Sequence, residues 1–247
     1  MVEINDITRP SADLIAGIKA VGAATASATL AHMGIRNCHI TGPVSWNKGK
    51  SIAGPALTLQ FMPKREDLYG DGEYADVEKQ LHRHVLYKVE KGDVVVVDAR
   101  GDITAGVFGD MMMTYFRGRG GAGMVIDGAI RDWVNIQKLD VPLWLNGVTP
   151  NFHTQTGLMP HAVNVTIACG GVTVVPGDII VADDDGAVCV PVALAAQVIE
   201  QASKHHEWED FSRMKLMEGA PLQRYYPLHD DARSEYEAWR KTHPIKR

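Results

Sequence analysis

The sequence has few cysteines and no long apolar run. Its three cysteines, Cys38, Cys169 and Cys189, are odd in number and form no CxxC pair, which argues against a disulfide framework and against a structural zinc site. We expect buried thiols in a reducing compartment. No stretch reaches the roughly 18 apolar residues that a membrane span requires, and the charged first ten residues lack the apolar segment of a signal peptide. These absences predict a cytoplasmic protein without a membrane partner.

The common signatures of nucleotide and hydrolase sites are also missing. There is no Walker A loop, no G-x-S-x-G elbow and no H-E-x-x-H pair. The stretch 118–123 matches G-x-G-x-x-G, but a predicted helix precedes it and a predicted strand follows, which reverses the order that a dinucleotide site needs. We interpret these glycines as a helix end and a tight turn. The net charge of −5 argues against a general nucleic-acid binder, so we expect no nucleic-acid partner.

The 247 residues, 45% of them apolar and 22% charged, suffice for one sizeable core. The clearest strand is the β-branched run at 94–97, which is apolar on both faces as in a buried strand. Helices are predicted at 11–34 (with a second short helix over 24–33), 76–89, 110–117 and 191–216, and further strands at 56–61, 124–127, 141–145, 163–168, 172–175, 179–182 and 187–190. We expect one α/β domain over residues 1–216, then a polar C-terminal helical extension over 217–247 without a core of its own.

Asp110 opens the helix predicted at 110–117, directly after Gly109. The first N–H groups of a helix have no partner inside the helix, and the helix dipole favours an anion there. A substrate carboxylate could therefore bind the backbone around Gly109, Met111 and Met112, with Gly109 permitting a close approach. The alternative is that Asp110 only caps its helix.

Arg131 and Asp132 follow the strand predicted at 124–127, and sites in α/β folds gather at such strand ends. Arg131 offers a planar fork for a carboxylate or a keto acid. Asp132 offers the hard oxygen ligands that Mg²⁺ or Mn²⁺ prefers. The alternative for this pair is an ordinary salt bridge in a turn.

The two segments form one pattern, in which Asp110 is followed by twenty residues and then by Arg131-Asp132. This pattern resembles the D-x20-R-D motif of a known enzyme family. These are the class II pyruvate aldolases that cleave 4-hydroxy-4-methyl-2-oxoglutarate and 4-carboxy-4-hydroxy-2-oxoadipate, and they share a fold with the RraA regulators of ribonuclease activity. The stretches GDVVVVD at 92–98, GMVIDGAIRD at 123–132 and PGDIIVADDDG at 176–186 also look like family sequence. The resemblance covers roughly residues 20–200 and implies a swivelling β/β/α, RraA-like α/β fold.

The resemblance also implies a role for each residue of the motif. Asp132 would be the direct ligand of Mg²⁺ or Mn²⁺, and Asp110 would hold a metal-bound water and position the proton-transferring water. Arg131 would bind the keto-acid oxygens and stabilise the enolate, while backbone groups from Gly109 to Met112 would hold the pyruvyl carboxylate. Family members form trimers that can pair into hexamers, so we expect a homotrimer or hexamer. They also draw an acidic residue from a neighbouring subunit, for which Glu207 and Glu209 are the candidates here.

These roles predict a metal-dependent lyase that acts on a small-molecule 2-keto diacid through a pyruvate enolate. The reaction is either aldol cleavage or the decarboxylation of oxaloacetate, because both form the same enolate. The competing hypothesis is a non-catalytic RraA-like regulator that binds an RNA-degrading enzyme. Such regulators are typically shorter and need no metal ligands, so the intact acidic pair and the chain length favour the enzyme.

The sequence departs from the family pattern in three places. Family members often carry an acid three positions after the Asp of the R-D pair, where this chain has Asn135, and a neutral amide would change the charge around a metal ligand. The stretch 62–74 and the tail after 217 are also unusual. Among the histidines, His82 is expected in polar packing or at the surface, and His153 is expected to line the pocket.

Overall fold

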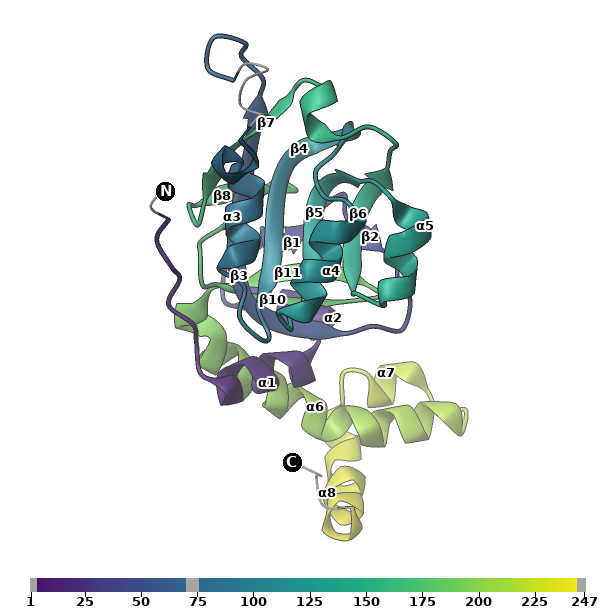
Figure 1. The fold of residues 1–247 in the computed structure, drawn as a ribbon. Coiled ribbons are helices and arrows are strands. Elements are labelled where there is room, and N and C mark those ends of the chain that lie inside the picture. Colours follow the sequence, from purple (N-terminus) through teal and green to yellow (C-terminus); the bar gives the residue numbers. More distant parts are fainter. Residues whose placement is uncertain (1–3, 70–75, 244–247) are drawn as a thin grey trace. The chain divides into compact units, whose positions relative to one another are not determined.

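The computed structural model describes residues 4–69 and 76–243, and the chain divides into two compact units, residues 1–198 and 199–247. The mixed α/β fold predicted from the sequence is confirmed (Figure 1). The helices are α1 (Ala12–Val21), α2 (Ala23–His32), α3 (Leu81–Tyr87), α4 (Asp110–Gly118), α5 (Trp133–Ile136), α6 (Ala195–Met217), α7 (Leu222–Tyr225) and α8 (Arg233–Thr242). Short 3-10 helices are η2 (Val77–Lys79), η3 (Gln137–Leu139), η4 (His153–Gln155), η5 (Val192–Leu194) and η6 (Asp230–Ala232). The boundary expected after residue 216 stays a prediction.

A mixed sheet organises the first unit. Its strands are β1 (His39–Ile40), β2 (Val44–Ser45), β3 (Ile52–Pro63), β4 (Val94–Gly106), β5 (Gly123–Ile130), β6 (Leu143–Val148), β7 (Leu158–Val163), β10 (Ile179–Asp183) and β11 (Gly186–Val190). Within the described residues they follow the order β1-β11-β10-β3-β4-β5-β6-β2, with β7 paired to β3. The central strands β3, β4, β5 and β6 run parallel, and the others pair antiparallel. The carboxyl ends of β4 and β5 therefore lie at the same edge of the sheet.

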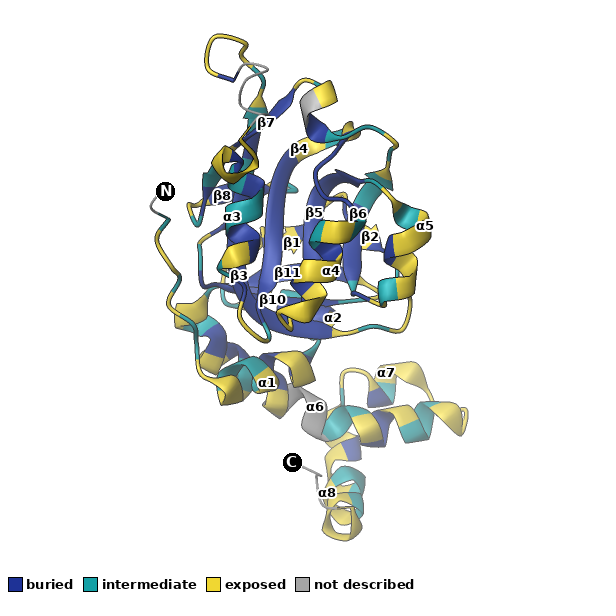
Figure 2. Cartoon of the chain, in the orientation of Figure 1, coloured by how far each residue is buried: buried dark blue, intermediate teal, exposed yellow. Residues whose placement is uncertain are grey.

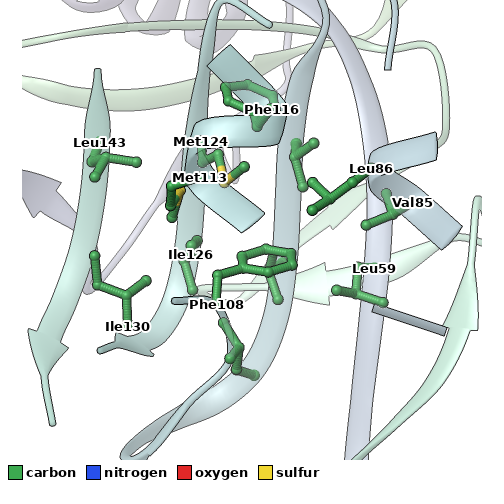
Figure 3. Packing of buried hydrophobic residues seen from close by; sticks show 14 of the residues in the cluster. Leu59, Val85, Leu86, Phe108, Met113, Phe116, Met124, Ile126, Ile130 and Leu143 are labelled. Carbon is green, nitrogen blue, oxygen red and sulfur yellow. The ribbon is translucent and has the colours of Figure 1, made fainter. Parts of the chain in front are cut away.

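The β-branched run at 94–97 is buried on both faces, as its sequence predicted (Figure 2). On one face, Val95 and Val97 join a large apolar cluster with residues of α3 and α4. Figure 3 shows this cluster, in which Met113 and Phe116 of α4 pack with Met124 of β5. Other members include Leu59, Val85, Leu86, Phe108, Ile126, Ile130 and Leu143. The burial of such side chains stabilises the fold by about 1.5–3 kcal/mol each, so α4 is held firmly against the sheet.

The opposite face of the sheet has a second cluster, in which Val94, Val96 and Val125 pack with Trp144 and with residues of β10 and β11. A separate two-stranded hairpin, β8 (Ile167–Cys169) with β9 (Val172–Val174), contributes to it. The continuous strand predicted at 163–168 is wrong, because β7 ends at Val163 and Asn164 turns into the left-handed region with φ 53°. An extended strand cannot continue through that conformation.

The N-terminal helices agree with their prediction. Ser11 caps α1, accepting a hydrogen bond from the amide of Leu14 at 3.3 Å, and α2 follows after Gly22. Within residues 4–69 and 76–243, no single helix is long and apolar enough to cross a membrane. Together α1 and α2 reach the required length and composition, but they are bent by 95°, and Ile18 and Leu30 are fully buried in the protein.

Two expectations are corrected along the rest of the chain. The helix predicted at 76–89 is divided into η2 and α3, because Gln80 between them is extended. The residues after 217 were expected to have no core, yet in the second unit Phe211, Tyr225 and Trp239 form a small aromatic cluster. Aromatic side chains bury enough area to support such a core in a short segment. Within the unusual stretch 62–74, residues 70–74 lie outside the described residues.

Candidate active site

Two chain segments meet where β5 ends and α4 begins. The amide of Val107 donates to the carbonyl of Ala129, and the amide of Arg131 donates to the carbonyl of Phe108, both at 3.0 Å. These backbone hydrogen bonds extend the pairing of β4 and β5 beyond the regular strands. Asp110, Arg131 and Asp132, which the sequence singled out, are therefore brought together at this edge of the sheet.

Asp132 has the most constrained backbone of the site. Its φ of 62° and ψ of 31° lie in the left-handed region, which few residues other than glycine, asparagine and aspartate adopt readily. Its Oδ2 accepts a hydrogen bond from the amide of Asp110 at 3.3 Å and lies 3.5 Å from Nε of Arg131. The side chains of Asp132 and Arg131 remain 35% and 38% exposed, so a small ligand can reach both.

Gly109 fits this arrangement because it has no side chain. A Cβ at this position would lie 2.6 Å from Oδ2 of Asp132 and 3.0 Å from Nε of Arg131. Both distances are shorter than ordinary van der Waals contact. The Arg131-Asp132 pair thus approaches the backbone of Gly109 closely, while the close approach of a substrate carboxylate to Gly109 stays a prediction.

The carboxylate of Asp110 is held by two donors. Its Oδ1 accepts from the amide of Met111 at 2.8 Å, and its Oδ2 accepts from Nδ2 of Asn135 at 3.1 Å. The sequence marked Asn135 only as a departure from a family pattern. The structure makes it a contact residue of Asp110, and the signal was its position three residues after Asp132, one turn along α5.

Among the residues that the structure describes, only part of the backbone that was expected to bind a substrate carboxylate is free of hydrogen bonds to the protein's own side chains. The amide of Met111 already donates to Asp110, while the side chain of Met111 is 75% exposed and that of Met112 packs against the core. The assignment of the backbone at 109, 111 and 112 to substrate binding stays a prediction.

The expectation that His153 lines the pocket is wrong, because its side chain is buried in the protein. His153 is only 3% exposed, and its ring lies 4.3 Å from that of His82, which is 4% exposed, and 6.0 Å from that of Phe61. Burial and, to a smaller extent, the positive charge of Arg131 together lower the pKa of His153 to about 4. Burial likewise holds the pKa of His82 well below its ordinary value. The two imidazoles therefore form a buried pair that is neutral at pH 7.

The neighbouring residue, Phe152, faces the site directly. Its ring centre lies 5.8 Å from Cζ of Arg131, a distance at which an aromatic face attracts a guanidinium. The amide of Gly106 donates to the carbonyl of Asn151 at 3.1 Å, which fixes this loop beside the end of β4. Phe152 thus bounds one side of the guanidinium.

The residues present fit a hard divalent cation better than zinc. Among the described residues, no group of three or more His, Cys, Asp or Glu side chains that could hold a metal ion is found, and a structural zinc site needs four such ligands. Mg²⁺ is commonly held by one or two carboxylates and keeps several waters. A partly exposed Asp132 with Asp110 beside it has that character.

The acidic residues expected from a neighbouring subunit belong to α6. Glu209 lies in the second compact unit, and the side chain of Glu207 lies outside the described residues. Their part in the site stays a prediction.

Comparison with known proteins identifies the family of this chain. The family description "RraA-like: Aldolase/RraA" matches residues 20–189. A protein of Halalkalibacterium halodurans named "Putative 4-hydroxy-4-methyl-2-oxoglutarate aldolase" is 35% identical over 158 residues, which cover 64% of this chain and 68% of that protein. Streptomyces coelicolor RraAS2, described as an unusual member of the RNase ES inhibitor RraA protein family, is 45% identical with a TM-score of 0.76, covering 84% of this chain and 98% of that one.

A further solved structure, an uncharacterized protein from Pseudomonas syringae pv. tomato, is 25% identical with a TM-score of 0.77. It covers 93% of this chain and 100% of that one. The region matched by the family, residues 20–189, contains the end of β5, the start of α4 and every residue of the D-x20-R-D motif. This chain belongs to the RraA-like family.

Proposed function

We propose that this protein is a divalent-metal-dependent carbon–carbon lyase that acts on a 2-keto diacid through a pyruvate enolate. The reaction is the retro-aldol cleavage of a 4-hydroxy-2-oxo acid, the decarboxylation of oxaloacetate, or both. The observation that carries the proposal is the convergence of Asp110, Arg131 and Asp132, with Oδ2 of Asp132 between the Asp110 amide and Nε of Arg131. The relative named for an aldolase supports the same reaction class.

Retro-aldol cleavage requires two proton transfers. As the 4-hydroxyl loses its proton, the C3–C4 bond breaks and its electron pair becomes the C2–C3 double bond of the enolate, with negative charge on the C2 oxygen. A proton added to C3 then completes pyruvate. We assign both transfers to Asp110, directly or through a water, because its carboxylate is held by donors and stays within reach of solvent.

Arg131 would bind the substrate and stabilise the charge that develops. Its guanidinium offers several N–H donors in a rigid fork, which suits the adjacent keto and carboxylate oxygens of a 2-keto acid. Its positive charge lowers the energy of the enolate oxygen more than that of the neutral carbonyl. A bound Mg²⁺ or Mn²⁺, held by Asp132 with Asp110 nearby, would supply further positive charge to the same oxygen.

Oxaloacetate reaches the same enolate by a shorter route. Its C3–C4 bond breaks as CO₂ departs, and no hydroxyl proton has to be removed. Only the proton at C3 remains to be delivered. The two reactions therefore share Arg131 and Asp132 and differ in how much they need Asp110.

We further propose that the active form is a homotrimer or a hexamer, in which Glu207 or Glu209 of a neighbouring copy completes the site. Support comes from apolar side chains next to the catalytic residues, because Met111 is 75% and Val134 68% exposed in the single chain. Exposed apolar side chains that gather at one place often mark an interaction surface. Light scattering after size-exclusion chromatography tests the assembly, and Glu207→Gln and Glu209→Gln test the acid.

The central experiment is a pyruvate assay. With Mg²⁺ or Mn²⁺, the purified protein should release pyruvate from oxaloacetate or from a 4-hydroxy-2-keto diacid, and EDTA should abolish the release. In D₂O it should also exchange the methyl protons of pyruvate, which reports enolate formation without a choice of substrate. A panel of such acids that yields no metal-dependent pyruvate would contradict the lyase, and activity that survives in Asp132→Ala would contradict the metal assignment.

The 45% identity with RraAS2 supports a second candidate, a non-catalytic regulator that binds an RNA-degrading enzyme. This hypothesis needs no metal and no Asp132. It predicts that the wild-type protein and Asp132→Asn slow RNA cleavage by RNase ES equally, with no pyruvate formed. Release of pyruvate without any effect on the ribonuclease would exclude it.

A further inference from the structure

Two hydrogen bonds cross between the start of α4 and the start of α5. The amide of Asp110 donates to Oδ2 of Asp132 at 3.3 Å, and Nδ2 of Asn135 donates back to Oδ2 of Asp110 at 3.1 Å. The turn that carries Asn135 is itself fixed, because the amides of Asn135 and Ile136 both donate to the carbonyl of Asp132, at 3.0 and 3.1 Å. Each acidic side chain is thus tied to the segment that carries the other.

The two donors on Asp110 act differently. The amide of Met111 belongs to the same helix and moves with it, so its bond to Oδ1 does not relate Asp110 to the rest of the site. Asn135 comes from α5, and its bond to Oδ2 fixes the carboxylate relative to Asp132. Without this bond, the Asp110 side chain would be freer to change rotamer, and its oxygens would lose their fixed direction.

We infer that Asn135 is a positioning residue, which aims the Asp110 carboxylate by donating to its Oδ2. The inference rests on the proposed function, because Asp110 carries the proton transfers there. It explains why an amide suits this position. An aspartate would be similar in shape but, when ionised, would have no N–H to donate, and it would bring a like charge against Asp110.

The test compares two amide-to-acid substitutions two residues apart in the chain. Asn135→Asp removes the donor that Asp110 uses. Gln137→Glu makes the same change of charge at an exposed residue whose amide bonds the carbonyl of Val134 at 3.3 Å. If positioning matters, Asn135→Asp lowers kcat for pyruvate formation about 10- to 100-fold, with little change in KM, because proton transfer and not binding is affected. Gln137→Glu stays within about twofold of the wild type.

Two further variants separate positioning from a structural role. Asn135→Gln keeps an amide donor and should recover most of the lost kcat. In an Asp110→Asn background, Asn135→Asp should cause no further loss, since the residue through which it acts is already disabled. Thermal unfolding, measured for every variant, should change little because Asn135 is exposed.

The outcomes are distinguishable. If wild-type protein forms pyruvate and exchanges pyruvate methyl protons but Asn135→Asp matches Gln137→Glu, the positioning role is overturned and the proposed function stands. Losses that add fully in the double variant overturn it as well. If the wild type shows neither activity, the proposed function and this inference fail together.

Discussion

The backbone of Asp110 and the side chain of Asp132 are joined by a hydrogen bond of 3.3 Å, although the two residues lie 22 positions apart in the chain. This bond links the first turn of α4 to the residue that follows β5 and Arg131. It directs one carboxylate oxygen of Asp132 toward the helix start, where the dipole favours negative charge. The relationship makes several substitutions around it informative.

Gly109→Ala should disturb the site without disturbing the fold. The added methyl would lie 2.6 Å from Oδ2 of Asp132 and 3.0 Å from Nε of Arg131, so both side chains must move. Because a displacement of about 1 Å in a catalytic group can cost on the order of 100-fold, we expect kcat/KM for pyruvate release to fall by that order. Gly118→Ala is the control, since a Cβ there meets nothing within 4 Å. Equal activity of the two variants would contradict this packing.

Asp132→Asn and Asp132→Ala should separate two roles of Asp132, the negative charge of its side chain and the left-handed conformation of its backbone. Asparagine tolerates the φ of 62°, so the Asn variant should unfold close to the wild-type temperature, while alanine should cost about 1–2 kcal/mol of unfolding free energy. Both variants lose the carboxylate, so both should lose Mn²⁺ binding, measured by electron paramagnetic resonance, and pyruvate release. Wild-type Mn²⁺ affinity in Asp132→Asn would show that the carboxylate is not the ligand.

Asp110→Asn should affect the two reactions unequally. Retro-aldol cleavage needs a base for the hydroxyl proton, and general-base catalysis is typically worth about 10²- to 10⁴-fold. Decarboxylation of oxaloacetate needs no such base and only the delivery of the C3 proton, so its rate should fall by less than the rate of retro-aldol cleavage. The measurement is kcat for pyruvate formed from a 4-hydroxy-2-keto diacid and from oxaloacetate, with the same enzyme and metal. A ratio unchanged from the wild type would argue against a proton-transfer role.

His153 should make the protein sensitive to acid. Its pKa is lowered from 6.5 to about 4 in the folded state, so its contribution to stability is complete above pH 6.5 and is lost as the pH falls toward 4, when only the unfolded chain gains the proton. The loss approaches about 3 kcal/mol. His153→Phe keeps a ring beside Phe61 and removes the titratable group. As the pH falls from 7 to 5, the urea midpoint of the variant should therefore decrease less than the urea midpoint of the wild type.

The exposed His161 of β7 provides the control for this series. His161→Phe should show the wild-type dependence on pH, because it makes the same ring substitution at the surface and leaves the buried pair of His82 and His153 intact. If His153→Phe and the wild type lose stability in parallel between pH 7 and 5, the acid sensitivity has another origin.

Much of the fold could be read from local pattern. The run at 94–97 is β-branched throughout, and a strand that is apolar on both faces has to be buried between two layers. Ser11 marks the start of α1 by its ability to cap. The division of 76–89 and the turn at Asn164 could not be read in this way, because each depends on a single residue leaving its expected conformation.

The second unit shows the limit of composition as a guide. The residues after 217 are polar on average, and a low apolar content predicts an arm. Phe211, Tyr225 and Trp239 nevertheless meet in one cluster, because a few aromatic rings can bury enough area once α6, α7 and α8 bring them together. The average polarity of a segment does not predict which of its side chains will pack together.

The sequence by itself determined the alternation of helices and strands and the spacing of Asp110, Arg131 and Asp132, because both depend on residue type and order. Only the tertiary structure decided what these residues contact. The bond from Asn135 to Asp110, the exclusion of any side chain at Gly109 and the burial of His153 all depend on segments that are distant in the chain. These residues come into contact only when β4 and β5 pair and α4 packs on the sheet. A local sequence pattern does not specify which distant residues will then be neighbours.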